Sequence, residues 1–98
     1  MFLINNSIEN ALINHIAILF IFIVIHSISF YIDNTSFNGA KNYLDIAYFT
    51  TSTHSSVGYG DITANKYHAK ITVMCHHIMM VFLSIQLLYA FINIDKNN

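Results

Sequence analysis

Two long apolar runs dominate the pattern of hydrophobic and polar positions along the chain. Residues 11–32 and residues 71–92 contain no Asp, Glu, Lys or Arg. A helix of about 20 apolar residues is long enough to cross the ~30 Å hydrocarbon layer of a bilayer. The pattern therefore predicts two transmembrane helices, the first over 11–32 and the second over 71–92.

A shorter helix is predicted between the two runs. Residues 33–41 are rich in Asp, Asn, Ser and Gly, which indicates an aqueous loop. Asn42 can cap the helix that follows, and Asp45 lies in its first turn, where a carboxylate meets the positive end of the helix dipole. The expected helix, 43–54, has about three turns and is too short to cross a bilayer. We expect it to enter the membrane and return through the non-helical residues 55–61, which at that depth must be buried in protein or line a wet cavity.

Composition narrows the class of protein. The chain has 98 residues, of which 55% are hydrophobic and 9% charged, and its net charge is −1 with no arginine. This composition indicates a membrane protein and leaves no basic surface for nucleic acid. Cys75 is the single cysteine, so an intrachain disulfide is excluded and a buried hydrophobic role is expected. The sequence has no phosphate-binding loop or cofactor motif and no evident nucleophile-and-base pair, so we predict neither an enzyme nor a bound cofactor.

Glycines alternate with other residues in the segment after the short helix. The candidate ion-coordinating residues are Ser56, Val57, Gly58, Tyr59 and Gly60. A dehydrated cation needs several oxygens at once, and consecutive carbonyls face one axis only if some residues adopt backbone angles closed to residues with a Cβ. Gly58 and Gly60 supply those angles. Rings of such carbonyls from several chains would replace the hydration shell of an ion such as K⁺.

The side chains of this segment are expected to support the carbonyl rings. Ser56 adds a hydroxyl at the inner end, and Val57 and Tyr59 point away from the axis to pack the filter from behind. Asp61 places negative charge at the outer mouth. The short helix aims its carbonyl end, with a partial negative charge, at the centre of the membrane, which favours a cation. The supporting residues are Asp61, Tyr48 and Ser55.

The segment SVGYGD resembles the potassium-channel signature TVGYGD, from which Ser56 alone departs. The order of span, short helix, glycine segment and span is similar to the two-span pore family. Tyr48-Phe49 followed by THSSVGYGD, and Ala69-Lys70 before an apolar run containing His76, most resemble the miniature potassium channels of large algal viruses.

The resemblance implies an all-α membrane protein with one pore domain over 1–98. A transmembrane helix, a re-entrant pore helix, a filter loop (residues 56–61) and a second transmembrane helix would form one subunit of a homotetramer in a lipid bilayer. Such a channel conducts K⁺ passively and has no voltage sensor or cytoplasmic regulatory domain. The host plasma membrane or an internal membrane of the virion is the implied location.

Two positions gain a role from the resemblance. Tyr48 stands where many relatives carry a Trp that bonds the filter aspartate, and its hydroxyl is expected to reach Asp61. Met80 falls near the glycine hinge usual in the inner helix, so a wide hinged opening is not expected.

Three residues on the second span are candidates to line the cavity or form a gate. They are Val81, Ser84 and Leu88, which follow one another at helical steps. The Ser84 hydroxyl can bond the carbonyl of Met80 and bend the helix. Packing of this small polar side chain against a neighbouring helix explains it equally well.

The histidines are predicted to form hydrogen bonds inside the protein rather than to bind a metal. They are His15, His26, His54, His68, His76 and His77. Adjacent residues on a helix point about 100° apart, so Cys75, His76 and His77 cannot share one ion, and no metal site besides that for K⁺ is expected. His76 is expected to face the back of the short helix.

Membrane orientation is ambiguous from charge alone. Lys41, Lys66 and Lys70 flank the filter loop, and the positive-inside rule would place that side in the cytoplasm. The family resemblance places it outside, and we follow the resemblance in naming the inner and outer ends.

Two rival functions remain open. A virus-encoded pore of poor selectivity and a nonconducting membrane adaptor would both use the same two spans. Neither needs glycine at alternating positions of the filter loop.

Overall fold

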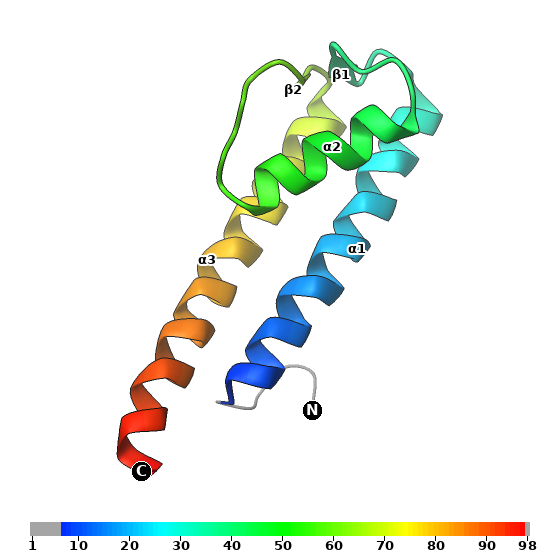
Figure 1. Cartoon of the computed structure of the whole chain (residues 1–98). Coiled ribbons are helices and arrows are strands. Elements are labelled where there is room, and N and C mark those ends of the chain that lie inside the picture. The colour runs from blue at the N-terminus through cyan, green and yellow to red at the C-terminus, as the bar shows by residue number, and fades with distance from the viewer. Residues whose placement is uncertain (1–6, 98) are drawn as a thin grey trace.

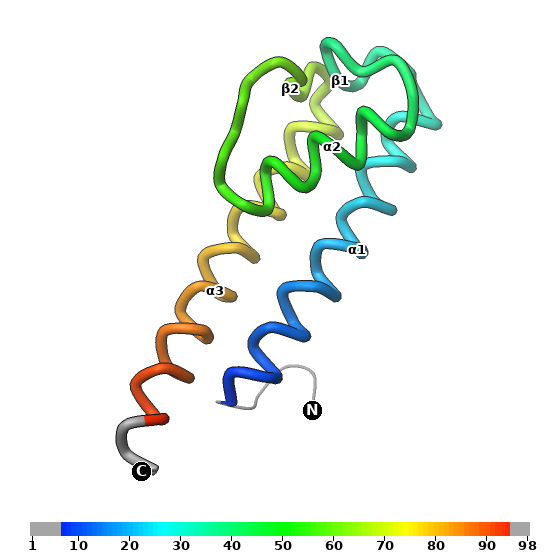
Figure 2. Tube along the Cα trace, viewed as in Figure 1, coloured from blue at the N-terminus to red at the C-terminus, as the bar shows by residue number. Residues whose placement is uncertain are grey.

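The computed structural model describes residues 7–97 as two long helices packed side by side, with a short helix lying across them near one end (Figure 1). The elements are α1 (Ile8–Ile32), β1 (Phe37–Asn38), α2 (Tyr43–His54), β2 (Thr63–Ala64) and α3 (Tyr67–Asn97). The start of α1 and the end of α3 lie at one end of the molecule, and both strands lie at the other (Figure 2). Residues 1–6 and 98, which belong to the single domain predicted over 1–98, are outside the described residues.

Both long helices extend beyond the apolar runs that predict them. α1 begins at Ile8 because the Ser7 hydroxyl accepts a hydrogen bond from the Asn10 amide and caps the first turn. α3 begins at Tyr67, four residues before the predicted span, and the Lys70 amide donates to the Lys66 carbonyl at 2.9 Å in its first turn. Helices do not stop at the edge of the hydrocarbon layer, since water satisfies their ends as well as protein does. Ile8–Ile32 and Tyr67–Ile94 are each long and apolar enough to cross a membrane.

A small hairpin that the sequence pattern does not predict joins the loop before α2 to the loop after the filter. It lies at the end of the molecule that contains both strands, which we call the outer end (Figure 2). β1 and β2 are antiparallel, with Phe37 opposite Ala64 and Asn38 opposite Thr63. Ser36, which is fully buried, anchors the hairpin: its carbonyl accepts from the Asn65 amide at 2.7 Å. The hairpin therefore ties the segment before α2 to the segment after the filter loop.

The link between α1 and the hairpin depends on Asp33, which follows the last residue of α1. Its carboxylate accepts hydrogen bonds from the amide and hydroxyl of Thr35 at 2.9 and 2.6 Å, and Lys66 lies 3.9 Å away. The Thr35 hydrogen bonds, aided by Lys66, hold the pKa of Asp33 below its usual value. This carboxylate therefore stays ionised and fixes the turn.

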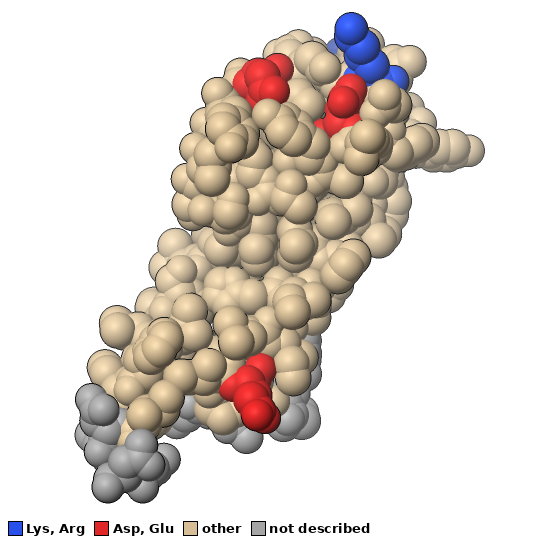
Figure 3. Space-filling view, in the orientation of Figure 1, with Lys and Arg blue, Asp and Glu red and all other residues tan. Residues whose placement is uncertain are grey.

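The buried core lies behind α2, where all three helices meet. It is formed by Phe30, Phe37, Ile46, Phe49, Ile62 and Ala69. A smaller cluster of Ile18, Phe22 and Leu83 joins α1 to α3 further toward the inner end. Figure 3 shows charged side chains near the two ends of one face, separated by a broad uncharged band. The exposed apolar band has the chemistry of a surface that meets lipid or neighbouring subunits.

Cys75 corrects one prediction, because its side chain is exposed rather than buried. The adjacent His76 is fully buried and occupies the inward face of α3. Neighbouring residues on a helix point about 100° apart, so Cys75 faces outward.

Candidate functional site

α2 positions the filter loop through well-defined hydrogen bonds at both of its ends. The Asn42 side chain accepts from the Asp45 amide at 2.9 Å, and the Asp45 carboxylate accepts from the Lys41 amide at 2.7 Å, which confirms the predicted cap. At the other end the Ser55 amide donates to the Thr51 carbonyl at 3.0 Å. The carbonyl end of α2, with its partial negative charge, therefore faces the start of the filter loop.

The filter loop has an alternating backbone. The φ angles of Ser56, Gly58 and Gly60 are positive, at 65°, 59° and 84°, whereas those of Val57 and Tyr59 are not. Alternate handedness turns successive N–H groups to one side of the chain and carbonyls to the other.

The hydrogen bonds of the loop agree with this arrangement. The amides of Val57 and Gly58 both donate to the Ser52 carbonyl, at 3.0 and 3.2 Å. Within the described chain no hydrogen bond uses the carbonyls of residues 56–60. These oxygens are therefore available to a ligand.

The positive φ of Ser56 is a feature that residue preferences miss. A residue with a Cβ pays about 1–2 kcal/mol in this conformation, which is why glycine was expected to supply it alone. In the sequence, the only sign of a positive φ at Ser56 is that it lies two residues before Gly58, which itself lies two residues before Gly60. Ser56 thus extends the alternation to the inner end of the loop.

The outer end of the loop is held by Tyr48 and Asp61. The Tyr48 hydroxyl donates to the Asp61 carboxylate at 2.9 Å, as expected from the sequence. This hydrogen bond raises the pKa of Tyr48, because ionisation would place a second negative charge beside Asp61. The Tyr48 and Tyr59 rings stack 6.0 Å apart with 7° between their planes. Tyr59 thereby points toward α2, away from the row of carbonyls.

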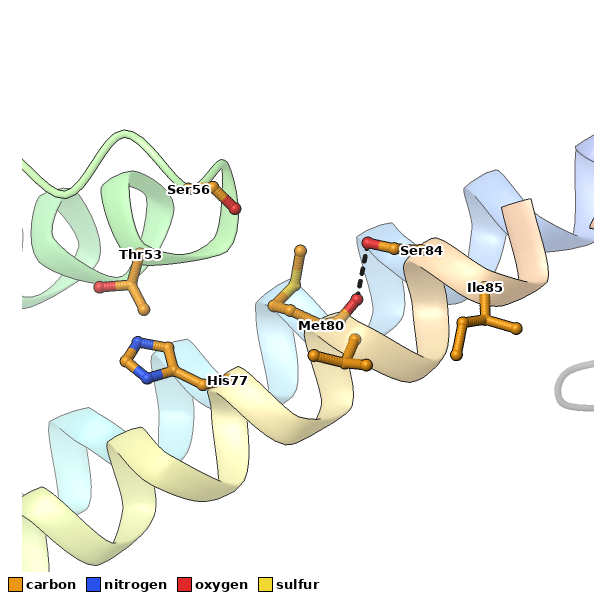
Figure 4. A pocket seen from close by; sticks show the side chains of 7 residues that line it. Thr53, Ser56, His77, Met80, Ser84 and Ile85 are labelled. Atoms are coloured by element: carbon orange, nitrogen blue, oxygen red, sulfur yellow. Dashed lines mark hydrogen bonds between the residues drawn. The ribbon is translucent and has the colours of Figure 1, made fainter. Parts of the chain in front are cut away.

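A hollow lies below the loop, between the end of α2 and α3 (Figure 4). Its volume is about 410 Å³, and we call it the inner hollow. It is lined by Thr53, Ser56, His77, Met80, Val81, Ser84 and Ile85. The Ser84 hydroxyl donates to the Met80 carbonyl at 2.8 Å, the bond expected from the sequence. Val81 and Ser84 line the inner hollow, whereas Leu88 lies outside it.

Two residues of α3 that line the inner hollow, His77 and Ile85, were not singled out as cavity candidates from the sequence. Ile85 follows Ser84 directly, and His77 lies two helical turns before it, beside Thr53 in Figure 4. Their helical spacing from Val81 is the signal that could have found them, since residues three or four apart share a face.

A family model described as "Ion channel" matches residues 18–94, which include most of α1, all of α2 and the filter loop, and α3 as far as Ile94. The chain belongs to the ion channel family. The match covers most of the first membrane-spanning helix and all of the second, so the channel is a membrane protein of a family that is generally oligomeric. A search of curated proteins and a search of solved structures each return no match.

Proposed function

We propose that the channel is one subunit of a homotetramer that conducts K⁺ selectively and passively across a membrane. The observation that carries this proposal is the alternating backbone of the filter loop, whose carbonyls at residues 56–60 make no hydrogen bond within residues 7–97. A row of such oxygens can replace the water around a dehydrated cation. The Ser56 hydroxyl continues the row inward, and Asp61 attracts cations at the outer mouth.

Several copies are required because one loop cannot surround an ion. Val57 and Tyr59 are 52% and 66% exposed in the single chain, although side chains of this kind pack behind a closed filter. Closed rotational symmetry around the loop would bury them and bring carbonyls from every copy to one axis. The negative ends of the α2 helices would then converge on the same axis, where they favour a cation.

Kinship with the miniature potassium channels of algal viruses is part of the proposal. It rests on the motif THSSVGYGD and on Ala69-Lys70 at the start of α3. A host plasma membrane or an internal membrane of the virion is the corresponding location.

Single-channel recording in a planar bilayer between K⁺ and Na⁺ solutions tests the proposed selectivity. We expect a reversal potential near the value for K⁺ alone. An ohmic current indifferent to the cation would support a poorly selective permeabilising pore instead. Silence from protein that has inserted as an oligomer would support a nonconducting adaptor.

Replacing Ser84 by alanine tests whether this residue is a gate. The substitution removes the 2.8 Å hydrogen bond to the Met80 carbonyl, a type of bond that often bends helices. We expect long closed events to disappear from single-channel records while the open current stays the same. Cys75→Ala on the outward face of α3 is the control, and unchanged closed times in Ser84→Ala would discard the gate.

Replacing Ser56 by threonine tests the inner end of the filter loop. Serine provides the oxygen but lacks the β-methyl that stiffens χ1, so we expect a looser innermost site. Ba²⁺ block should therefore be weaker or reverse faster in the natural channel than in Ser56→Thr. Equal block and recovery in the two proteins would contradict this prediction.

A further inference from the structure

A chain of histidines from all three helices runs through the interior beside the filter loop. His15 Nδ1 lies 3.4 Å from His54 Nε2, His54 Nδ1 lies 3.0 Å from His76 Nε2, and His76 Nδ1 lies 3.3 Å from His26 Nε2. His26 Nδ1 is 3.5 Å from the Thr72 hydroxyl. We call these imidazoles, His15, His54, His76 and His26, the histidine chain.

Every link in the histidine chain joins a Nδ1 atom to the Nε2 atom of the next ring. A neutral imidazole has one N–H donor and one acceptor nitrogen, so a single tautomer in all rings satisfies every link. With each proton on Nδ1, the chain donates from His15 toward Thr72. With each proton on Nε2, it donates in the opposite direction. The same rings thus have two neutral arrangements in which every link between rings is a hydrogen bond.

The two ends of the histidine chain differ. At the inner end, His15 Nε2 is buried and has no hydrogen-bond partner among residues 7–97. At the outer end, Thr72 is half-buried and its hydroxyl also donates to the Ala69 carbonyl at 2.9 Å. His15 and His26 are eleven residues apart on α1, which corresponds to about 16 Å along the helix axis. The chain therefore covers about half of a ~30 Å hydrocarbon layer.

The surroundings keep the rings in place. His26 and His76 are 0% exposed, and the Phe22 ring stacks on His76 at 4.3 Å with 2° between the planes. Phe37 and Phe49 both present T-shaped contacts to His26, with ring centroids 5.7 Å away. Reorientation of rings packed in this way is hindered.

The histidine chain cannot coordinate a metal ion, but its geometry allows proton transfer from ring to ring. Each link uses a different pair of nitrogens, so no single point lies near three of them, and the described residues contain no group of His, Cys, Asp or Glu able to hold a metal ion. Ionisable groups inside membrane proteins often form proton relays. Among the described residues His77, also on α3, is the further titratable group that acts electrostatically on His26 and His76.

We propose that the histidine chain is a proton relay separate from the filter loop. A proton arriving at His15 Nε2 displaces the proton on His15 Nδ1 to the next ring, and the shift repeats along the chain. The proton on His26 Nδ1 leaves toward the Thr72 hydroxyl and the outer side. One proton enters and one leaves, every ring ends as the neutral Nε2–H tautomer, and no other covalent bond changes.

The concerted shift explains why neutral rings suit this role. A charged imidazolium held in the hydrocarbon layer is unfavourable, and both end states avoid it. After the shift each Nε2–H points back toward His15, so each ring must turn by about 180° about its Cβ–Cγ bond before the chain can pass a second proton. Because the packed rings are hindered, this turn is slow. We therefore expect proton flux far slower than K⁺ flux through the filter loop.

Proton uptake by channel oligomers in lipid vesicles tests the relay. Vesicles loaded with K⁺ and pyranine are diluted into Na⁺ buffer with valinomycin, which sets the same membrane potential for every variant. We expect proton influx above that of empty vesicles and a fall of about tenfold or more in His15→Phe and in His76→Gln, since transfer needs donor and acceptor within hydrogen-bond reach. His68→Gln, outside the histidine chain, should match the natural protein.

Three results would overturn the relay: influx equal to that of empty vesicles, influx unchanged in His15→Phe, or an equal loss in His68→Gln. His15 lies at the half-buried end of the histidine chain and decides the matter if His76→Gln does not assemble. Nitrogen-15 NMR of labelled histidine gives a second readout. We expect His15, His54, His76 and His26 to share one tautomer, and mixed tautomers along the chain would contradict the relay.

Discussion

Replacing Gly58 by alanine is expected to abolish K⁺ current. Gly58 has a φ of +59°, and an alanine in this region of backbone space costs about 1–2 kcal/mol. In the proposed tetramer the cost is repeated in every subunit and reaches about 4–8 kcal/mol. Since each 1.4 kcal/mol is a factor of ten, the population of correctly shaped filters should fall about a thousandfold or more. Single-channel and macroscopic current in the same bilayers measure this loss.

A D-alanine at the same position is the matched control. Among residues 7–97 of the same chain, no atom lies within 4 Å of a Cβ built on Gly58, so within one subunit the effect of L-alanine comes from the backbone angle rather than from a clash. D-alanine favours positive φ and adds the same methyl group, and a chain of this length can be assembled by chemical ligation. We expect Gly58→D-Ala to conduct K⁺. Full current in the L-alanine variant would show that the alternating backbone is not needed for conduction.

Replacing Gly39 by alanine is expected to destabilise the outer end of the channel by about 2–4 kcal/mol. The φ of Gly39 is +88°, and a Cβ on this residue would collide with the backbone carbonyl of Asp61. The collision pushes Asp61 away from Tyr48 and strains the hairpin between β1 and β2. Thermal unfolding in detergent micelles, followed by circular dichroism, measures the loss.

The neighbouring Asn38 provides the control for this substitution. Asn38 is exposed, and its amide makes only a long 3.4 Å hydrogen bond to the Thr63 hydroxyl. We expect the free energy of unfolding of Asn38→Ala to lie within about 0.5 kcal/mol of that of the natural protein, as is usual for surface substitutions. An unfolding midpoint of Gly39→Ala equal to that of Asn38→Ala would mean that the carbonyl of Asp61 moves aside freely.

The helices could be predicted because local signals mark them. The apolar runs are long enough for spans, and α2 has a capping residue, Asn42, followed by a carboxylate at Asp45. Their ends were harder to predict, since α3 continues through polar residues from Tyr67, where hydropathy says nothing of backbone conformation. The strands were missed because two residues are too few to show an alternating pattern.

Only those features of the candidate site that depend on residue type and short spacing in the sequence could be predicted. The glycines of the filter loop and the hydrogen bonds of Tyr48 and Ser84 follow from residue type and spacing, and the structure contains both bonds. The positive φ of Ser56 contradicts the preference of serine and depends on its neighbours. The proposed bilayer recordings test whether these residues select K⁺, because a single chain supplies only part of an ion-binding filter.

The histidine chain shows what tertiary contact adds. His15 and His26 are eleven residues apart, which is close to three turns, so they share one face of α1 and could have been paired from the sequence. His54 and His76 complete the chain only because α2 crosses between α1 and α3. The expectation that His76 faces the back of α2 is confirmed by its 3.0 Å contact with His54.

The lengths of α1 and α3 bear on hydrophobic mismatch. The apolar runs of these helices, residues 11–32 and 71–92, each correspond to about 33 Å, whereas the hydrocarbon layer is ~30 Å thick. Helices that exceed the layer tilt, or project beyond it. Because Asn14 of α1 donates to Gln86 of α3 at 2.8 Å, the two helices are joined and tilt together, with α2 lying across them. A thick, sterol-rich membrane would hold this pair more upright than a thin one, so lipid composition becomes a means of changing the angle at which α2 approaches the axis of the proposed pore.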